Sequence, residues 1–530
     1  MPEAHTILGR PVVMGRSAAA STGHWLASEA ALAIMRDGGN AVDGAVAALA
    51  VLAVVKPDAC ALGSDLFLQI FDAATGTVIA LNASGPAPAL ANIEAFNGAV
   101  PLRGPRAVAV PGAVAGWGAA LDRFGSLGLK RVLAPAIALA RDGFPIGLHL
   151  ATALAGGNDV LRSDADLART FLPGDRLPGY GELIRQPALA DTLATIAQDG
   201  AKAFYTGTFA RALDADMKAR EGLLRLEDLE SYEPQWRPSL HVKYRGHDVF
   251  EQPLISQGVI VLEAAKILEG FPLERYGDRS ADFAHLHAEA VKLAVADRQR
   301  YLGDPAFVDA PLEQLLEDDF IEQRRRTIDV QRANPKVPAG ALRNALAHTS
   351  YGCTVDARGN GVSFIQSIFE VWGSGYMVPG TGTLMNNRMV GFSLDPNEPN
   401  ALAPGKRTMH TLNTVVVCKG GKLRWLFGTP GAHAQVQANT QLLTRLIDFG
   451  QNPQAAIEAP RIFWRGGATL DVESRFGAAT LDELRRRGHD VIDLGAWHPD
   501  TGGMEIIHIN DHGVREAGAD PRREGYALAY

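Results

Sequence analysis

The stretch HTSYGCTVDARGNGVSFIQSIFEVWGSG, residues 348–375, decides the fold that the sequence predicts. Alternating apolar and small polar residues over 349–356 and over 361–369 indicate two strands. The residues between them, ARGN at 357–360, are typical of a tight turn. We therefore expect a β-hairpin, and with it an antiparallel sheet that contains this part of the chain.

The predicted register of this hairpin brings two hydroxyl groups together. If Asp356 pairs with Gly361, Thr349 lies opposite roughly Ile368. The hydroxyl of Ser367 then comes near the start of the first strand, where it could orient the hydroxyl of Thr349.

The segment before the hairpin, NPKVPAGALRNALA at 334–347, has little regular pattern and predicts a mobile, reachable loop. A loop followed by a threonine and a strand suits self-cleavage, in which the threonine hydroxyl attacks the preceding carbonyl and ester hydrolysis exposes a new amino terminus. The α-amine could then act as base for the same hydroxyl. A Thr-Ser pair that opens a strand is also typical of a solvated strand end or a turn, and the pattern alone does not separate these interpretations.

A second segment, LFGTPGAHAQVQANTQLLTRLIDFG at 426–450, passes from a strand through a glycine turn into an apolar helix. Backbone N–H groups at such a turn have no partner within the helix and can face an anion. They could stabilise the oxyanion of acyl transfer. An ordinary glycine turn is the alternative.

The rest of the chain predicts an α+β protein. Helical spacing of apolar residues is clear over 25–38, 40–55 and 281–301, and the region 110–300 is mainly helical. Strand patterns occupy 65–83 and return after residue 344, with further helices near 435–448 and 478–487. Strands at both ends with helices between them indicate layered packing.

Composition excludes several classes of protein. A formal net charge of −8 and a pI near 6.0 argue against a nucleic-acid or anionic-membrane surface. The three cysteines, Cys60, Cys353 and Cys418, exclude a disulfide framework and show no zinc-site spacing. The first residues lack the apolar core of a secretory signal, and no stretch is apolar enough to span a membrane. We therefore predict a cytoplasmic protein. The threonine chemistry described above implies no metal or organic cofactor.

Motifs along the whole chain resemble those of the γ-glutamyltransferase (glutathione hydrolase) family. They are GGNAVDGAVAAL at 38, VPGAVAGW at 110, PAIALARDGFPI at 135, HAEAVKLAVADRQRYLGDP at 287, the hairpin at 349, ALAPGKRTMHTLN at 401, GTPGAHAQ at 428, PQAAIEAPR at 453 and DPRREGYA at 520. The resemblance implies the four-layer αββα sandwich of N-terminal-nucleophile hydrolases. It also implies self-cleavage into a large subunit, 1–348, and a small subunit, 349–530, intertwined in one domain.

The resemblance assigns the catalytic residues by motif. Thr349 matches the family nucleophile, and Ser367 matches the hydroxyl residue that bonds to it. Gly431 and Ala432 match the two backbone donors of the oxyanion hole, where the family usually has two glycines. A methyl group leaves the N–H available, so we expect the hole to survive.

The substrate-binding positions depart from the family pattern. A zwitterionic γ-glutamyl head needs charged partners, because burying unpaired charges costs several kcal/mol. The family's arginine, its asparagine, its acidic residue and its serine pair are replaced here, and ALGSDLF at 61–67 replaces a glycine-rich stretch; the matching positions are Ser84 or Ala83, Phe369, Gly391, His410 and Thr411. Strings such as IQS, VPGTG, NNR and FSLDP resemble a divergent branch that hydrolyses other amides, including glutaryl-type acylases and oxamate amidohydrolases.

Some alternatives stay open at the level of sequence. His410 is a candidate substrate contact or a histidine bonded to backbone beside a strand, and Cys353 lines the site or fills the core. The implied function is a self-processing amide hydrolase or acyltransferase acting on a small-molecule amide, either γ-glutamyl or another carboxylated acyl amide. A metabolite-binding pseudoenzyme is the rival hypothesis. The sequence does not decide whether the chain forms a homo-oligomer.

Overall fold

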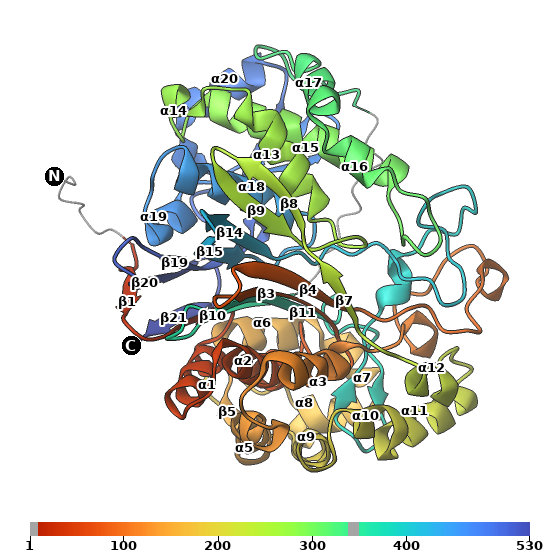
Figure 1. The fold of residues 1–530 in the computed structure, drawn as a ribbon. Coiled ribbons are helices and arrows are strands. Elements are labelled where there is room, and N and C mark those ends of the chain that lie inside the picture. Colours follow the sequence, from red (N-terminus) through yellow and green to blue (C-terminus); the bar gives the residue numbers. More distant parts are fainter. Residues whose placement is uncertain (1–8, 338–348) are drawn as a thin grey trace.

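The computed structural model describes residues 9–337 and 349–530. Two seven-stranded antiparallel sheets face each other at its centre, and helices cover the outer face of each sheet (Figure 1). The layers therefore follow the order αββα, as the resemblance implied.

The first sheet holds the predicted hairpin at its middle, so the start of the hairpin is covered on both sides. Its strands in spatial order are β21 (Tyr526–Ala529), β2 (Ala19–Thr22), β10 (Ser350–Val355), β11 (Gly361–Ser367), β3 (Asp65–Asp72), β4 (Thr77–Ala83) and β7 (Gln235–Pro238). Every residue of β10 and β11 is buried.

The second sheet lies against the first. Its strands in spatial order are β1 (Val13–Gly15), β20 (Arg515–Ala519), β19 (Glu505–Ile509), β15 (Lys422–Gly428), β14 (Val415–Lys419), β9 (His247–Glu251) and β8 (Leu240–Tyr244). The expectation of a mainly helical region over 110–300 is confirmed, but it did not include β7, β8 and β9. β7 and β8 are edge strands, β9 lies next to β8, and burial alternates along β8 and β9, which gives a weak signal between long helices.

The helical layers confirm the clearest periodic patterns. Against the first sheet lie α1 (Trp25–Arg36) and α2 (Ala41–Val55); α2 is buried on all sides because it packs against α1, α5 (Ala134–Asp142) and the sheet. The other layer contains α13 (Val259–Glu269), α15 (Ala281–Tyr301), α18 (Ala434–Ile447) and α20 (Ala478–Arg486).

The register of the hairpin differs from the prediction by one residue. Val355, not Asp356, pairs with Gly361. Asp356 belongs to the turn instead, because its carboxylate accepts the N–H groups of Arg358 and Asn360 at 2.9 and 3.0 Å. Continued to the start of the strand, this register places Thr349 opposite Ser367.

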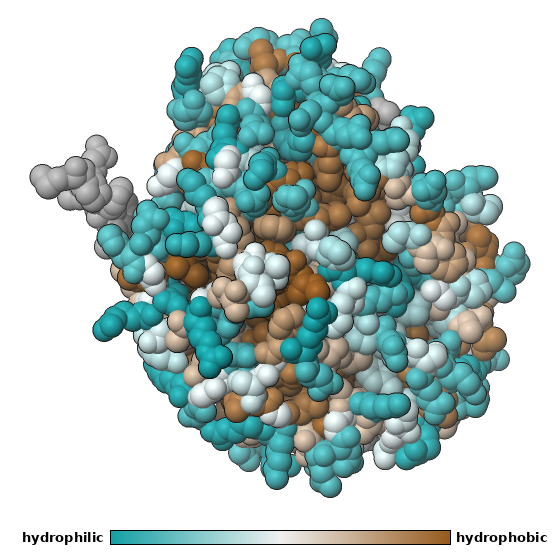
Figure 2. All heavy atoms as spheres, in the orientation of Figure 1, coloured by the Kyte–Doolittle hydropathy of each residue, from teal (hydrophilic) through white to brown (hydrophobic). Residues whose placement is uncertain are grey.

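In the view of Figure 2, hydrophilic residues cover most of the two helical layers, and hydrophobic residues show between them. Within 9–337 and 349–530, no helix combines the length and the apolar character that crossing a membrane requires.

Candidate active site

Three polar side chains form one row across the first sheet. Ser367 pairs with Asp65 between β11 and β3, and Thr349 continues the row on the other side of Ser367. Directly opposite residues of an antiparallel pair point to the same face. That face looks toward the second sheet, since Tyr351 and Phe67, two residues along their strands, lie in the core between the sheets.

The Thr349 hydroxyl donates a hydrogen bond to Ser367 Oγ at 3.2 Å. Ser367 Oγ also accepts the backbone N–H of Phe369 at 2.8 Å, which fixes the serine. Thr349 and Ser367 are both buried. From residue 338 onward, the predicted loop and residue 348 lie outside the described part of the chain. The structure therefore places the acceptor of the Thr349 hydroxyl but not the peptide bond before Thr349.

Asp65 connects this row to a buried arginine. Its Oδ1 accepts the N–H of Gly85 at 3.0 Å, and its Oδ2 accepts Arg388 Nε at 2.7 Å. Burial raises the pKa of Asp65, and the opposing effect of Arg388 does not compensate for it. The guanidinium of Arg388 lies 4.3 Å from the centre of the Phe369 ring.

His410 and Thr411 reach the same region from the segment before β14. His410 Nε2 is 3.9 Å from Asp65 Oδ2, and its ring stands edge-on to Phe67. Neither ring nitrogen of His410 has a hydrogen-bond partner within the described residues; its backbone N–H and C=O are the groups that are bonded. Burial, followed by the charge of Arg388, lowers the pKa of His410 well below 6.5, so the ring is neutral at pH 7.

The glycine turn between β15 and α18 lies at the same end of the sandwich as Thr349. The Tyr351 ring packs on Gly428, the last residue of β15, so the turn that follows extends toward the start of β10. Gly431 and Ala432 both have positive φ, 123° and 51°. A non-glycine residue in this conformation is strained, a feature that clusters at functional sites.

One buried glutamine ties this turn to the segment of His410. Gln257 Nε2 donates to the carbonyl of Ala432 at 2.9 Å and to the carbonyl of Thr411. Because the carbonyl of Ala432 is held, the peptide that follows it is fixed in orientation.

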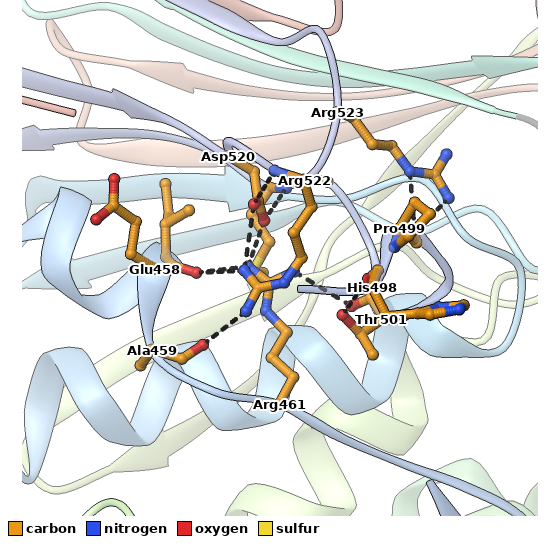
Figure 3. Close-up of polar contacts among 12 residues, drawn as sticks. Glu458, Ala459, Arg461, His498, Pro499, Thr501, Asp520, Arg522 and Arg523 are labelled. Carbon is orange, nitrogen blue, oxygen red and sulfur yellow. Dashed lines mark hydrogen bonds and ion pairs between the residues drawn. The ribbon is translucent and has the colours of Figure 1, made fainter. Parts of the chain in front are cut away.

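Figure 3 shows a cluster of arginine side chains and their polar partners, among them Arg461, Asp520 and Arg522. We define the arginine cluster as Arg461, Glu473, Asp520 and Arg522, all buried. Arg522 binds both oxygens of Glu473, at 2.7 and 2.6 Å, and Asp520 binds both arginines. Two residues of the DPRREGYA motif, Asp520 and Arg522, therefore connect the C-terminal segment to Arg461 and Glu473 by buried ion pairs.

This arginine cluster supports the glycine turn through the loop before β19. Arg461 Nη1 donates to the carbonyl of Thr501 at 3.2 Å, and the N–H of Gly503 donates to Thr429 Oγ1 at 2.8 Å. A side-chain carbon at Gly431 would lie 3.7 Å from Gly502 Cα. The loop thus packs directly against the turn.

The remaining predicted binding positions are poor in charge. Ser84 is buried and donates to Asn82 at 2.6 Å. Gly391 packs under Thr408. Phe369, at φ 79°, packs with Ala432 and contacts Arg388. Cys353 is fully buried between the sheets, which supports the core interpretation for this cysteine.

Sequence reasoning missed Asp65 and Arg388. They lie in the strings ALGSDLF and NNR, which depart from the family pattern. This departure could have pointed to both residues. Spacing could not connect them, because 323 residues separate the two partners.

Within the described chain, His285, Glu289 and His489 have ligand-type atoms within 4.8 Å of one another. Glu289 already accepts Lys292 Nζ at 2.6 Å, and His285 Nδ1 is 2.8 Å from His489 Nε2. We interpret the group as a buried polar network between α15 and the segment after α20. The expectation that no cofactor is needed stays a prediction.

Known proteins resemble this chain over nearly its whole length. The Gamma-glutamyltranspeptidase family matches residues 27–530. The glutathione hydrolase-like YwrD proenzyme of Bacillus subtilis is 37% identical over 97% of this chain and 99% of its own. The oxamate amidohydrolase proenzyme of Klebsiella pneumoniae is 36% identical over 96% and 97%. The crystal structure of cephalosporin acylase from Bacillus halodurans superposes with a TM-score of 0.93 at 36% identity, covering 100% of this chain and 99% of that one. The chain therefore belongs to the γ-glutamyltranspeptidase family and is a self-processing amide hydrolase or acyltransferase.

Proposed function

We propose that Thr349 becomes the amino-terminal nucleophile of a small subunit, 349–530, when the bond to residue 348 is cut. The hydroxyl of Thr349 attacks the preceding carbonyl carbon, the C–N bond breaks, and the amine takes up the proton. Water then hydrolyses the ester, which leaves a carboxylate at the end of a large subunit, 1–348, and a free amine on Thr349.

The same hydroxyl then attacks the substrate amide. The α-amine of Thr349 accepts its proton and passes it to the leaving amine, and an acyl-threonine ester forms. Water, or an acceptor amine, resolves this ester and restores the hydroxyl. The N–H groups of Gly431 and Ala432 stabilise the oxyanion of each tetrahedral intermediate, and Ser367 orients the nucleophile.

The observation that carries this proposal is the 3.2 Å hydrogen bond between Thr349 Oγ1 and Ser367 Oγ at the buried start of β10. A solvated strand end would be exposed and would not bond to a second fixed hydroxyl. The positive φ angles of Gly431 and Ala432, at the same end of the sandwich, support the second half of the machinery.

We further propose that the acyl group is small and carboxylated, and that γ-glutamyl compounds are poor substrates. Ser84, Phe369 and Gly391 offer no charge to a zwitterionic head, whose burial without partners costs several kcal/mol. Relatives named for glutathione and for oxamate both match the chain, so their names do not decide the question. A cytoplasmic location stays a prediction.

Denaturing gel electrophoresis tests the nucleophile. Wild-type protein should give two fragments, and mass spectrometry of the smaller should begin at Thr349. Thr349→Ala should remain one chain of 56.4 kDa without activity, whereas Thr349→Ser, which keeps a hydroxyl, should still cleave.

A wild-type chain that stays intact and releases no amine from any amide would favour the pseudoenzyme hypothesis instead. Ammonia or p-nitroaniline release from γ-glutamyl-p-nitroanilide, oxamate and glutaramate then ranks the acyl groups. Efficient turnover of the γ-glutamyl compound would contradict the proposed specificity.

A further inference from the structure

Arg388 is a buried cation whose hydrogen bonds are incomplete. Its side chain is 1% exposed. Nε binds Asp65 Oδ2 at 2.7 Å and the guanidinium faces the ring of Phe369, yet Nη2 has no hydrogen-bond partner within residues 9–337 and 349–530. Leaving a buried donor without a partner costs about 1–3 kcal/mol, and more when the group is charged.

Two residues of the segment before β14 also carry polar side-chain atoms without partners. Both ring nitrogens of His410 and the hydroxyl of Thr411 lack partners in the described part of the chain, although both residues are buried. The backbone carbonyls near them are occupied, since Arg298 donates to the carbonyl of His410 and Gln257 to that of Thr411. The free hydrogen-bonding capacity of this segment therefore lies in side chains and not in these backbone carbonyls.

The charge of this region favours an anion. Arg388, Arg298 and Arg407 act on His410, and all three lower its pKa. The facing acids are Asp65, whose pKa burial raises, and Glu370. Because Asp65 binds only the Nε edge of Arg388, the Nη2 edge remains for a second anion.

The position of this edge relative to Thr349 limits the size of the ligand. Thr349, Ser367 and Asp65 occupy three neighbouring strands in one row. Neighbouring strands lie about 5 Å apart, so the backbone of Thr349 is about 10 Å from that of Asp65. Arg388 binds Asp65 directly, so a carboxylate on Arg388 and a carbonyl at the Thr349 hydroxyl can belong to one short acyl chain.

We propose that Arg388 is the carboxylate-binding residue of the acyl pocket, and that it selects monoamides of short dicarboxylic acids with His410 and Thr411 as neutral hydrogen-bonding partners. The inference rests on the proposed function and deepens it. In the reaction, Thr349 Oγ bonds to the amide carbon and the amine leaves with a proton. Water then cleaves the ester and releases the dicarboxylic acid.

A matched series of substrates tests this assignment. Oxamate, malonamate, succinamate and glutaramate differ in chain length, and oxamide, malonamide, succinamide and glutaramide are their uncharged counterparts. Ammonia release should show a kcat/KM about 10- to 100-fold higher for the carboxylated member at the preferred, short length, the range expected for one charge-assisted hydrogen-bonded pair.

Arg388→Gln should raise KM for the monoamides more than for the diamides, so that the ratio of their kcat/KM values, and with it the preference, is lost. Arg388→Lys keeps the charge but not the planar fork, and should retain part of the preference. Appearance of the two self-cleavage fragments reports that each variant folds and that its nucleophile works. If Arg388→Gln does not cleave itself, the substrate preference of Arg388→Lys tests the role of Arg388 instead.

Calorimetric binding of oxalate, succinate and glutarate separates the pocket from the reaction. Dicarboxylate binding by wild type that weakens at least tenfold in an Arg388 variant supports the pocket even if no amide is turned over, in which case only the proposed function fails. A self-cleaved, active enzyme that hydrolyses monoamides and diamides equally, or an Arg388→Gln variant that keeps the preference, overturns the role of Arg388 and leaves the proposed function intact.

Discussion

The arginine cluster and the site around Arg388, which we call the Arg388 pocket (Asp65, Arg388, His410 and Thr411), both contain buried arginines and carboxylates. They differ in how many of their polar atoms have hydrogen-bond partners. In the arginine cluster, Arg522 and Arg461 outweigh burial and hold the pKa of the Glu473 and Asp520 carboxyls below their usual values of 4.5 and 3.8. In the Arg388 pocket, burial outweighs the arginine, and the pKa of Asp65 is raised.

The difference lies in how many donors find a protein acceptor. Arg522 binds Glu473, Asp520 and the carbonyls of Ile457 and Ala459. Arg388 has one carboxylate partner and one donor without any in the described chain. A buried ion pair with saturated bonds holds structure together, whereas one with free capacity can bind a ligand.

The largest expected effect separates the two arginines by stability. In a Thr349→Ala background, which should keep the chain in one piece, Arg522→Met should lower the free energy of unfolding by about 3–5 kcal/mol, because Glu473 and Asp520 each lose a buried arginine partner. Arg388→Met should cost clearly less, since Asp65, with its raised pKa, can take up a proton. Urea unfolding measures both variants. An equal loss at Arg388 would mark it as structural.

A prediction of intermediate size concerns the stability of the protein at acidic pH. The pKa values of Glu473 and Asp520 are lowered in the folded protein. The stability that these two carboxylates contribute is therefore present above about pH 4.5 and is lost as the pH falls through their pKa values in the folded state. Unfolding free energy should therefore decline below pH 4.5, by about 1.4 kcal/mol for each pH unit that separates the folded pKa of a carboxyl from its unfolded pKa.

Two matched variants sharpen this acid prediction. Asp520→Asn should flatten the decline. Asp65→Asn should not flatten the decline and should make it steeper, because the raised pKa of Asp65 acts in the opposite direction: the stability that Asp65 contributes is present below pH 3.8 and is lost as the pH rises through the folded value. Urea midpoints between pH 3 and pH 7 distinguish the two, and identical curves would contradict the contrast.

The smallest effect concerns Gln257, which is saturated at its nitrogen and unpartnered at Oε1 in the described chain. Gln257→Met should lower kcat about tenfold with little change in KM, the cost of one hydrogen bond that positions Ala432. Gln69→Met is the control, because buried Gln69 bonds to Thr414, outside the turn. A fall in kcat of the same size in both variants would show a merely structural role for Gln257.

Local patterns predicted the local structure well. The helix over 281–301 and the strands on either side of the turn at 75–76 follow from periodicity, which is a property of neighbouring residues. The prediction missed β7 to β9, because these strands are short and only partly buried and leave a weak pattern. The hairpin register was wrong by one residue, since the carboxylate of Asp356 closes the turn before pairing begins.

The αββα class, the family, and Thr349 with Ser367 as candidate catalytic residues could all be predicted from the sequence, because they depend on motifs that are contiguous in the chain. The packing of the two sheets was needed to show that Asp65 belongs to the row of Thr349 and that Arg388 and His410 lie beside it. This is so because the properties of a buried polar group depend on its surroundings. Whether Arg388 is saturated or free depends on which distant side chains the two sheets bring within hydrogen-bonding distance of it.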